Sequence, residues 1–131
     1  MGLFIDFSHE KGTLSKIQQY GTGGDNNAMS QNKLKITVLK RQDPKEIFDE
    51  YPVAERDWFV PCGLYEDGQE FILEENLGMP EKFCPSAWQT IYHNVRTLGY
   101  GGNLPYFEEE GVAISCCSDG MRPVIFKIER I

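Results

Sequence analysis

Four cysteines are the side chains of this sequence best suited to chemistry: Cys62, Cys84, Cys116 and Cys117. A thiolate sulfur is a strong nucleophile, and it is also a ligand for zinc and for iron–sulfur clusters. The four are not arranged as CxxC pairs, the spacing typical of a structural zinc site. Spacing therefore leaves open whether these thiols bind a metal, react, or only pack.

Cys84 has the most informative neighbourhood. It stands directly before Pro85, and proline suits the first position of a helix. Cys84 is therefore expected to be the N-cap of a helix, close to unpaired backbone N–H groups and to the positive end of the helix dipole. Both favour a thiolate, so Cys84 is a candidate metal ligand or catalytic nucleophile. The alternative is a small buried apolar residue at a helix start.

Cys116 and Cys117 are neighbours at the end of an apolar run, where a strand would place their side chains on opposite faces. Alternation groups Cys116 with Val112 and Ile114, the more apolar set. We therefore expect Cys116 to be packed and Cys117 to face a pocket or solvent. We also expect Cys84 to lie close enough to one of the pair to share a site. The alternative is that both are simply packed thiols.

A metal site is one way to use these thiols together. Three thiolates completed by His93, Asp119 or a water would hold zinc, and three or four would hold an iron–sulfur cluster. Cys62 fits this role because Gly63 beside it permits the backbone angles of a ligand loop. The predicted metal ligands are Cys62, Cys84, Cys116 and Cys117.

Arg122 is a second candidate for chemistry, together with Cys84. It follows the turn sequence "SDG" and precedes Pro123, and a guanidinium near the cysteines would bind and orient an anionic group. The alternative is that Arg122 forms only a surface ion pair with Asp119, and such pairs contribute little to stability. No phosphate-binding loop, nucleophile elbow or zinc-protease motif is present in the sequence, so whether the protein is an enzyme stays open.

The hydrophobic pattern predicts the elements that must position these residues. Alternation predicts strands, and apolar residues at helical spacing predict one long helix. We expect a strand at 33–41, a short helix at 44–51, a hairpin at 57–75 turning at Asp67 and Gly68, a long helix from about Pro85 to 98, and a hairpin at 112–128 turning at Ser118–Gly120. Pro123 is expected on an edge strand or at a strand start. The fold class is α+β, a small antiparallel sheet of about four or five strands packed against one long and one short helix.

Composition limits the partners. The net charge is −7 and no block of Lys and Arg occurs, which argues against nucleic acid and anionic membranes. No apolar run approaches the about 18 residues that a membrane span needs, and no secretory signal is visible, so a reducing cytoplasmic location is expected. A small sheet with an exposed edge favours a homo-oligomer.

The sequence divides into two parts. Residues 1–28 read as an N-terminal extension or leader that ends in the flexible linker "GTGGDNNA". They offer a place for a protein partner to bind. Residues 29–131 are expected to form the single cysteine-containing α+β domain.

Two long segments resemble a known family. They are "GMPEKFCPSAWQTIYHNVRTLGYGGNLPYF", which contains an FCPxAW motif, and "VAISCCSDGMRPVIFKIERI", with a CCxDGxRPVxFKxER motif. They are similar to a family of short cysteine-containing proteins of bacteria and archaea, many of them anaerobes, built on a unit of about 90 residues. The resemblance covers roughly 33–131. It implies that the recurrent family positions are Cys62, Cys84, the pair Cys116 and Cys117, and the run from Asp119 to Pro123, and it carries no established activity.

Three hypotheses for function follow. The first is a small cytoplasmic protein that binds zinc or an iron–sulfur cluster through its cysteines. The second is a thiol-based enzyme or redox protein that uses Cys84. The third is a structural or interaction module whose cysteines are buried.

Overall fold

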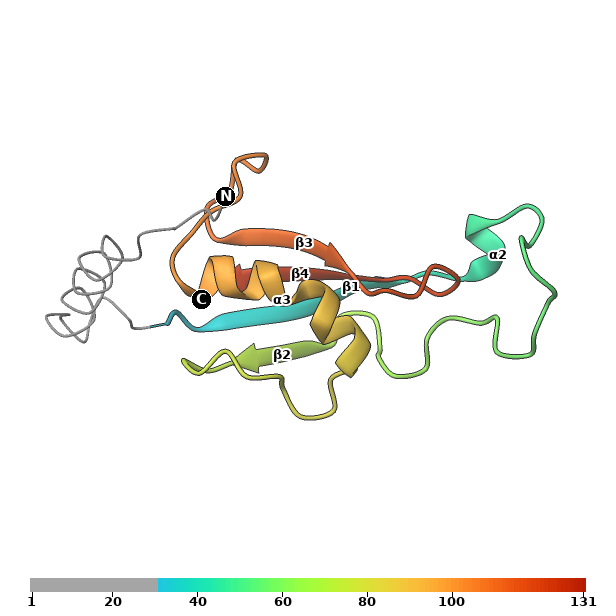
Figure 1. Cartoon of the computed structure of the whole chain (residues 1–131), viewed down its shortest axis with the longest axis horizontal. Helices are drawn as coiled ribbons and strands as arrows, with labels where there is room; N and C mark the ends of the chain where they lie inside the picture. Colours follow the sequence, from blue (N-terminus) through green and yellow to red (C-terminus); the bar gives the residue numbers. More distant parts are fainter. Residues whose placement is uncertain (1–30) are drawn as a thin grey trace, which may run out of the picture. The chain divides into compact units, whose positions relative to one another are not determined.

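Four antiparallel strands form the sheet of this protein, seen in a computed structural model that describes residues 31–131 (Figure 1). In spatial order the strands are β2 (Glu70–Leu73), β1 (Leu34–Arg41), β4 (Val124–Arg130) and β3 (Val112–Cys116). The helices are the short α2 (Pro44–Ile47) and the long α3 (Pro85–Gly99). The predicted α+β class, with its antiparallel sheet and one long and one short helix, is confirmed.

The hydrophobic core lies between the sheet and α3, which covers one face (Figure 1). Alternate residues of β1 and β4 are fully buried on that face, and Ile36 lies opposite Ile128 in the β1–β4 ladder. From α3 the buried side chains recur at helical spacing: Ala87, Ile91, Val95 and Leu98. Apolar alternation in the strands and a helical apolar stripe thus meet in one layer, as such patterns require.

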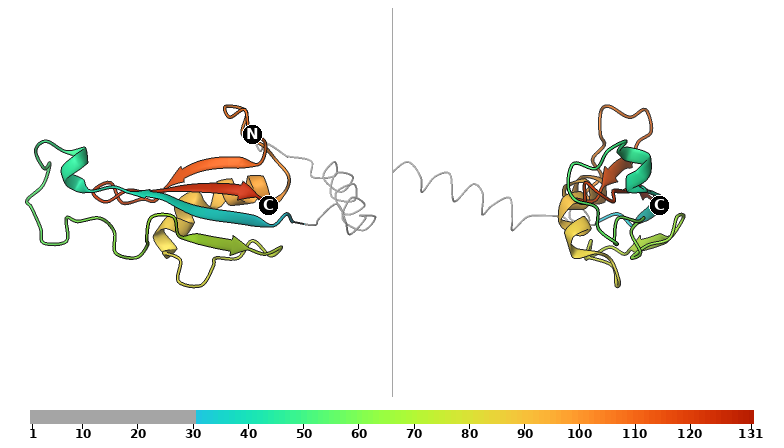
Figure 2. Two further views of the ribbon diagram at one scale, coloured as in Figure 1. Left: turned by 180° about the vertical axis from the view of Figure 1, so that it is seen from behind. Right: turned by 90° about the vertical axis from the view of Figure 1, so that its right-hand side faces the viewer.

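The other face of the sheet mixes charged side chains with apolar ones such as the exposed Ile72 and Ile114. In residues 31–131 it carries no helix, as the view from behind shows (Figure 2). Lys35 of β1 forms ion pairs there with Glu70 of β2 (3.5 Å) and Glu129 of β4 (3.9 Å). Charged side chains on this face agree with contact to solvent, because unpaired charge is seldom buried.

The helix α3 begins at Pro85 with Cys84 as its N-cap, as the sequence predicts. At its other end Arg130 of β4 donates a hydrogen bond from Nη1 to the Leu98 carbonyl (3.1 Å). A guanidinium suits this position because the last carbonyls of a helix lack partners and carry partial negative charge. The helix is therefore fixed to the sheet through its C-terminus as well as through its apolar stripe.

The helix α2 is shorter than predicted. Asp43 caps it by accepting from the Lys45 N–H (3.0 Å), but Phe48 already has extended backbone angles. Ile47, its last residue, is 41% exposed and does not belong to the core. A helix of four residues has no second turn with which to build an apolar stripe.

The predicted hairpin at 57–75 is wrong in its first strand. Residues 48–69 form neither helix nor strand, and β2 pairs with β1 instead, with Leu73 opposite Leu34. The turn at Gly68 is present: its φ is +84°, which glycine adopts without strain. Pro61 lacks an N–H for a ladder, and Phe59 and Tyr65 are buried by ring packing rather than by strand pairing.

The hairpin at 112–128 is confirmed, because β3 and β4 pair from Val112 opposite Glu129 to Cys116 opposite Ile125. Pro123 immediately precedes β4, so it marks a strand start, where its missing N–H interrupts no ladder. It is not on an edge strand, because β4 lies between β1 and β3. Pro123 therefore gives no argument for an exposed edge, and the expected homo-oligomer stays a prediction.

The buried face of β3 is the opposite of the one predicted. Ala113 is fully buried, whereas Ile114 is 43% exposed. Ser115 also faces the helix, where its Oγ accepts a hydrogen bond from Asn94 Nδ2 of α3 (2.7 Å). The face of β3 toward α3 therefore carries the small side chains of Ala113 and Ser115 rather than the larger Ile114.

The expectations for residues 1–28, an extension with a linker that binds a protein partner, fall outside the described residues. The described residues form one compact unit, Gln31–Ile131. Within that unit, no helix combines the length and apolar character needed to cross a membrane.

Two isoleucines test the assignment of faces. Ile128→Ala should lower the free energy of unfolding by about 2–5 kcal/mol, because it leaves a cavity in the core. Ile114→Ala should cost less than about 1 kcal/mol, because its side chain is already in contact with solvent. Urea denaturation of both variants measures the difference, and equal losses would contradict the orientation of β3.

Candidate functional site

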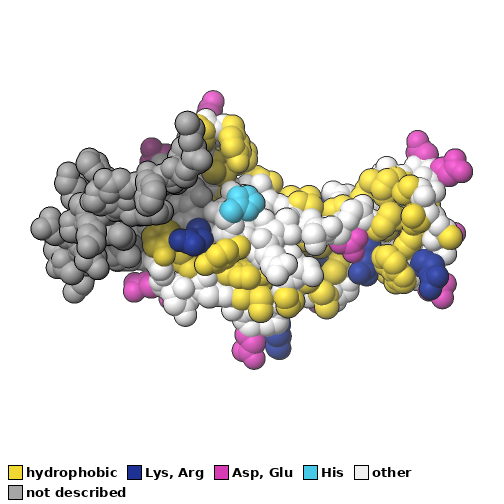
Figure 3. Space-filling model, in the orientation of Figure 1, with side chains coloured by type: hydrophobic (Ala, Val, Ile, Leu, Met, Phe, Trp, Pro, Cys, Tyr) yellow, Lys and Arg dark blue, Asp and Glu magenta, His cyan; other side chains and the backbone are white. Residues whose placement is uncertain are grey.

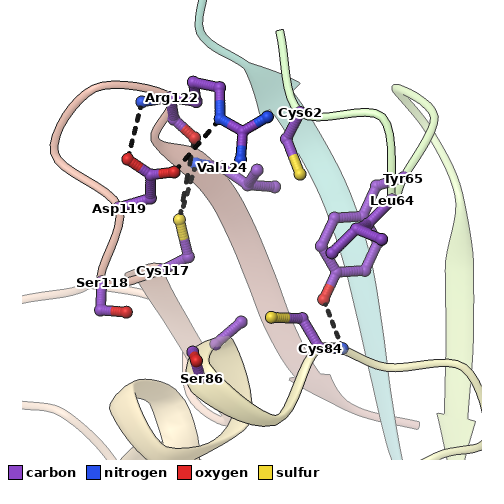
Figure 4. Close-up of a pocket in the computed structure, with 11 residues that line it drawn as sticks. Cys62, Leu64, Tyr65, Cys84, Ser86, Cys117, Ser118, Asp119, Arg122 and Val124 are labelled. Carbon is purple, nitrogen blue, oxygen red and sulfur yellow. Dashed lines mark hydrogen bonds and ion pairs between the residues drawn. The ribbon is translucent and has the colours of Figure 1, made fainter. Parts of the chain in front are cut away.

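Three of the four cysteines line one cavity of about 260 Å³ (Figure 4). Its walls come from three separate segments: the irregular stretch before β2, the start of α3, and the turn between β3 and β4 with the first residue of β4. The lining residues are Cys62, Leu64, Tyr65, Cys84, Ser86, Ala87, Cys117, Ser118, Asp119, Arg122 and Val124. Side chains distant in sequence thus meet at one end of the helix.

Cys84 presents its sulfur to the cavity (Figure 4). As N-cap of α3 it has extended backbone angles (φ −69°, ψ 122°), but its side chain makes no capping hydrogen bond. Its backbone N–H donates instead to the Tyr65 hydroxyl (2.9 Å). The thiol is therefore not used in capping the helix and remains directed at the cavity.

Tyr65 supports the floor of this site. Its side chain is 3% exposed, and its ring packs against Phe71, Phe83 and Phe126 with centroid distances of 5.9, 5.5 and 5.4 Å. Burial raises the pKa of Tyr65 to about 12, and the neighbouring thiols of Cys84, Cys62 and Cys117 add to the rise. The hydroxyl therefore stays neutral at ordinary pH.

Cys117 lines the cavity from the hairpin side. Its Sγ accepts a hydrogen bond from the Val124 N–H (3.2 Å) and donates weakly to the Arg122 carbonyl (3.9 Å). Its own N–H donates to the Val124 carbonyl (3.0 Å), which extends the β3–β4 pairing one residue beyond β3. The position of this sulfur is therefore fixed by backbone contacts.

Cys116 does not belong to the cavity. It alternates with Cys117 and is partly exposed, together with Ile114, so the expectation that it is the packed member of the pair is wrong. Partial burial raises the pKa of the Cys116 thiol, and the adjacent Cys117 adds to the rise. Cys116 is therefore held in its neutral, less nucleophilic form.

Arg122 is held in place at the cavity by two contacts. Its Nε donates to Asp119 Oδ2 (3.2 Å), and its guanidinium carbon lies 5.0 Å from the centroid of the Trp58 ring. The side chain is 27% exposed, and its terminal Nη groups make no hydrogen bond to any residue in 31–131. Figure 4 shows the guanidinium between Asp119 and Cys62. The predicted pairing with Asp119 is therefore present, and it leaves donors free.

Asp119 organises the turn itself. Its Oδ1 accepts from the backbone N–H groups of Met121 (2.9 Å) and Arg122 (3.1 Å). Partial burial alone would raise the pKa of Asp119, but these hydrogen bonds and the Arg122 guanidinium outweigh it and lower the pKa below its ordinary value. The carboxylate is therefore charged and fully engaged within the turn.

The predicted metal ligands are brought together only in part. Cys62, Cys84 and Cys117 share the cavity, whereas Cys116 and the exposed His93 do not line it. Over residues 31–131, no three His, Cys, Asp or Glu side chains are grouped so that they could hold a metal ion. A zinc or iron–sulfur site at the four cysteines stays a prediction.

Two aromatic residues of the site escaped the sequence analysis. Tyr65 and Trp58 lie in the segment before β2 that was expected to form a strand, so nothing indicated that they would reach the start of α3 and the hairpin turn. The structure shows instead a long irregular segment, and such segments in compact domains often carry function.

Comparisons with protein-family models, with curated proteins and with solved structures find no match for this chain. The family resemblance drawn from the motifs therefore stays a prediction. The functional argument rests on the geometry of the cavity.

Replacing Tyr65 by Phe tests the link between the irregular segment and α3. The variant keeps the buried ring but leaves the Cys84 N–H without its acceptor, so it should lower the free energy of unfolding by about 1–3 kcal/mol. Tyr92→Phe, at an exposed position of α3, is the matched control and should change it by less than about 0.5 kcal/mol. Similar small losses in chemical denaturation of both variants would show that the hydrogen bond is unimportant.

The pH dependence of stability tests Asp119. A carboxyl whose pKa is lowered in the folded state adds stability that is present above its unfolded pKa, about 3.9, and is lost as the pH falls through the folded value. Asp119→Asn should therefore be most destabilising above about pH 4, and its deficit should shrink in more acidic solution. Urea unfolding at a series of pH values measures this, and a deficit independent of pH would contradict it.

Proposed function

We propose that this cavity is a thiol-based reaction site in which Cys84 is the nucleophile. The observation that carries the proposal is that Cys62, Cys84 and Cys117, from three separate segments, line one cavity. Cys62 belongs to the hydrophobic core, and Cys84 and Cys117 pack against it. On the cavity side the three thiols also border the Arg122 guanidinium, and a neighbouring cation favours thiolate chemistry.

Cys84 is preferred over the other two thiols because of its surroundings. Cys62 is 9% exposed, so a reagent would reach it poorly. The Cys117 sulfur already has a backbone N–H partner. The Cys84 sulfur makes no hydrogen bond to any described residue, is partly exposed, and lies at the positive end of a 15-residue helix. A developing negative charge is stabilised at that end.

The proposed step is a nucleophilic substitution by sulfur at the substrate. The Cys84 thiolate forms a bond to an electrophilic atom of the substrate, and the leaving group departs with the electron pair of the broken bond. Arg122 orients an anionic group of the substrate through its free Nη donors. Such chemistry needs reduced thiols, and all four cysteines are unpaired, so the proposed location is the reducing cytoplasm.

Metal binding remains a second candidate, because the same three sulfurs face one space. Zinc or an iron–sulfur cluster would require the side chains to move closer together and a fourth ligand to join them. Elemental analysis of protein purified without oxygen separates this candidate from the first, since a stoichiometric metal that protects the three thiols would replace the proposal of a free nucleophile.

Alkylation of the folded, reduced protein by iodoacetamide tests the proposal. Peptide mapping by mass spectrometry should show Cys84 modified at least about tenfold faster than Cys116, because burial keeps Cys116 neutral. Cys84→Ser should remove the fast phase, and Cys116→Ser, its matched control, should leave it intact. A fast phase on Cys116, or none on Cys84, would refute the assignment.

A further inference from the structure

The cavity contains a fixed positive charge beside its thiols. Arg122 cannot easily swing away, because Asp119 holds its Nε and the Trp58 ring lies against its guanidinium. Its Nη groups are the donors that remain. Paired donors of this planar kind fit the oxygen atoms of an anion with defined geometry.

The start of α3 supplies donors on the opposite wall. The first N–H groups of a helix lack partners within the helix, and here no side chain caps them. Ser86 and Ala87, which occupy these first positions, line the cavity, as does the hydroxyl of Ser118 from the hairpin (Figure 4). Arg122 and the helix start thus present donors to one space from two directions.

Uncompensated negative charge is missing from this lining. Asp119 is the only acidic residue among the lining residues, and both its oxygens are engaged by Met121 and Arg122. Cys62 lines the cavity as a member of the hydrophobic core. A site with spare donors and with its carboxylate already hydrogen-bonded is suited to an anion.

We propose that the ligand of this cavity is a small oxyanion, held between the Nη groups of Arg122 and the start of α3, with Cys84 beside it. The volume of about 260 Å³ has room for such an ion and for an attached organic group, because a cavity of about 150 Å³ already holds a benzene ring. This inference names the substrate class of the proposed thiol site and therefore rests on that function. The anionic group of a larger molecule would use the same donors, so a free oxyanion and an attached one are the two sources of this ligand chemistry.

A pair of alkylating reagents tests the inference at the residue concerned. Iodoacetate and iodoacetamide have nearly the same shape and reaction: sulfur bonds to the methylene carbon and iodide leaves with the bonding electrons. Only iodoacetate carries a negative charge. The ratio of its rate to that of iodoacetamide at Cys84 should exceed the ratio at Cys116 by about tenfold, as expected when charge-assisted hydrogen bonds from the Arg122 Nη groups hold its carboxylate.

Competition by sulfate is a second test, and it uses the unmodified protein. Sulfate should slow iodoacetate at Cys84 more than sodium chloride of equal ionic strength does, and calorimetry should detect its binding. Phenyl phosphate in place of sulfate distinguishes the two sources of the anion. Competition by phenyl phosphate as strong as that by sulfate would assign the anionic group of a larger molecule, and weaker competition would assign a free oxyanion.

Charge variants complete the design. Arg122→Gln should abolish both the rate ratio and the sulfate heat, whereas Arg96→Gln, which removes the same charge from an exposed position of α3 outside the cavity, should preserve both. Arg122→Lys keeps the charge and should retain part of the rate ratio and of the sulfate binding if Arg122→Gln unfolds the turn.

Equal iodoacetate-to-iodoacetamide rate ratios at Cys84 and Cys116, without sulfate binding, would overturn the inference. Fast iodoacetamide labelling of Cys84 would still support the thiol site in that case. Sulfate binding with an unreactive Cys84 would support the anion site and refute the thiol function.

Discussion

The hydrogen bond from the Cys84 N–H to the Tyr65 hydroxyl is the contact on which the site depends. Tyr65 belongs to a segment without helix or strand, so no backbone ladder fixes it. Its ring is instead held by Phe71, Phe83 and Phe126 in the core. The buried hydroxyl needs a partner, and the start of α3 provides one. That bond sets the position of Cys84 relative to Cys62, three residues before Tyr65.

The opposite wall is built by a separate constraint, the turn between β3 and β4. Asp119 accepts two backbone N–H groups and the Arg122 Nε, so it shapes the turn and positions the guanidinium together. Trp58 from the irregular segment lies against that guanidinium and joins the two walls. Apolar side chains also gather on the surface at the α2 end (Figure 3), and the exposed ones between α2 and Tyr65 are Val53, Trp58, Val60 and Leu64. A long loop that keeps its aromatic residues at a pocket is consistent with a functional role.

Much of this fold could be predicted from the sequence, because period-two and helical patterns report local burial. Ile36, Ile128 and Ile91 were predictable from their spacing alone, and the helix start at Pro85 followed from proline chemistry. The orientation of β3 was not predictable in this way. Ala113 rather than Ile114 faces α3, whereas hydrophobicity along the strand favours the set of Val112, Ile114 and Cys116.

Some residues of the cavity could be predicted from the sequence, but their arrangement around one space could not. Cys84 and Arg122 stood out by their neighbours, but nothing local separates Cys117 from Cys116, since only the pairing of β3 with β4 decides which sulfur turns toward the helix. The role of Tyr65 depends on a contact with Cys84, 19 residues further along the sequence.

A crystal structure of the reduced protein tests the account most directly. It should place the sulfurs of Cys62, Cys84 and Cys117 around one cavity bordered by Arg122, with the Cys116 sulfur outside it. A structure in which Cys84 points away from the cavity, or Cys116 replaces Cys117 there, would contradict the account.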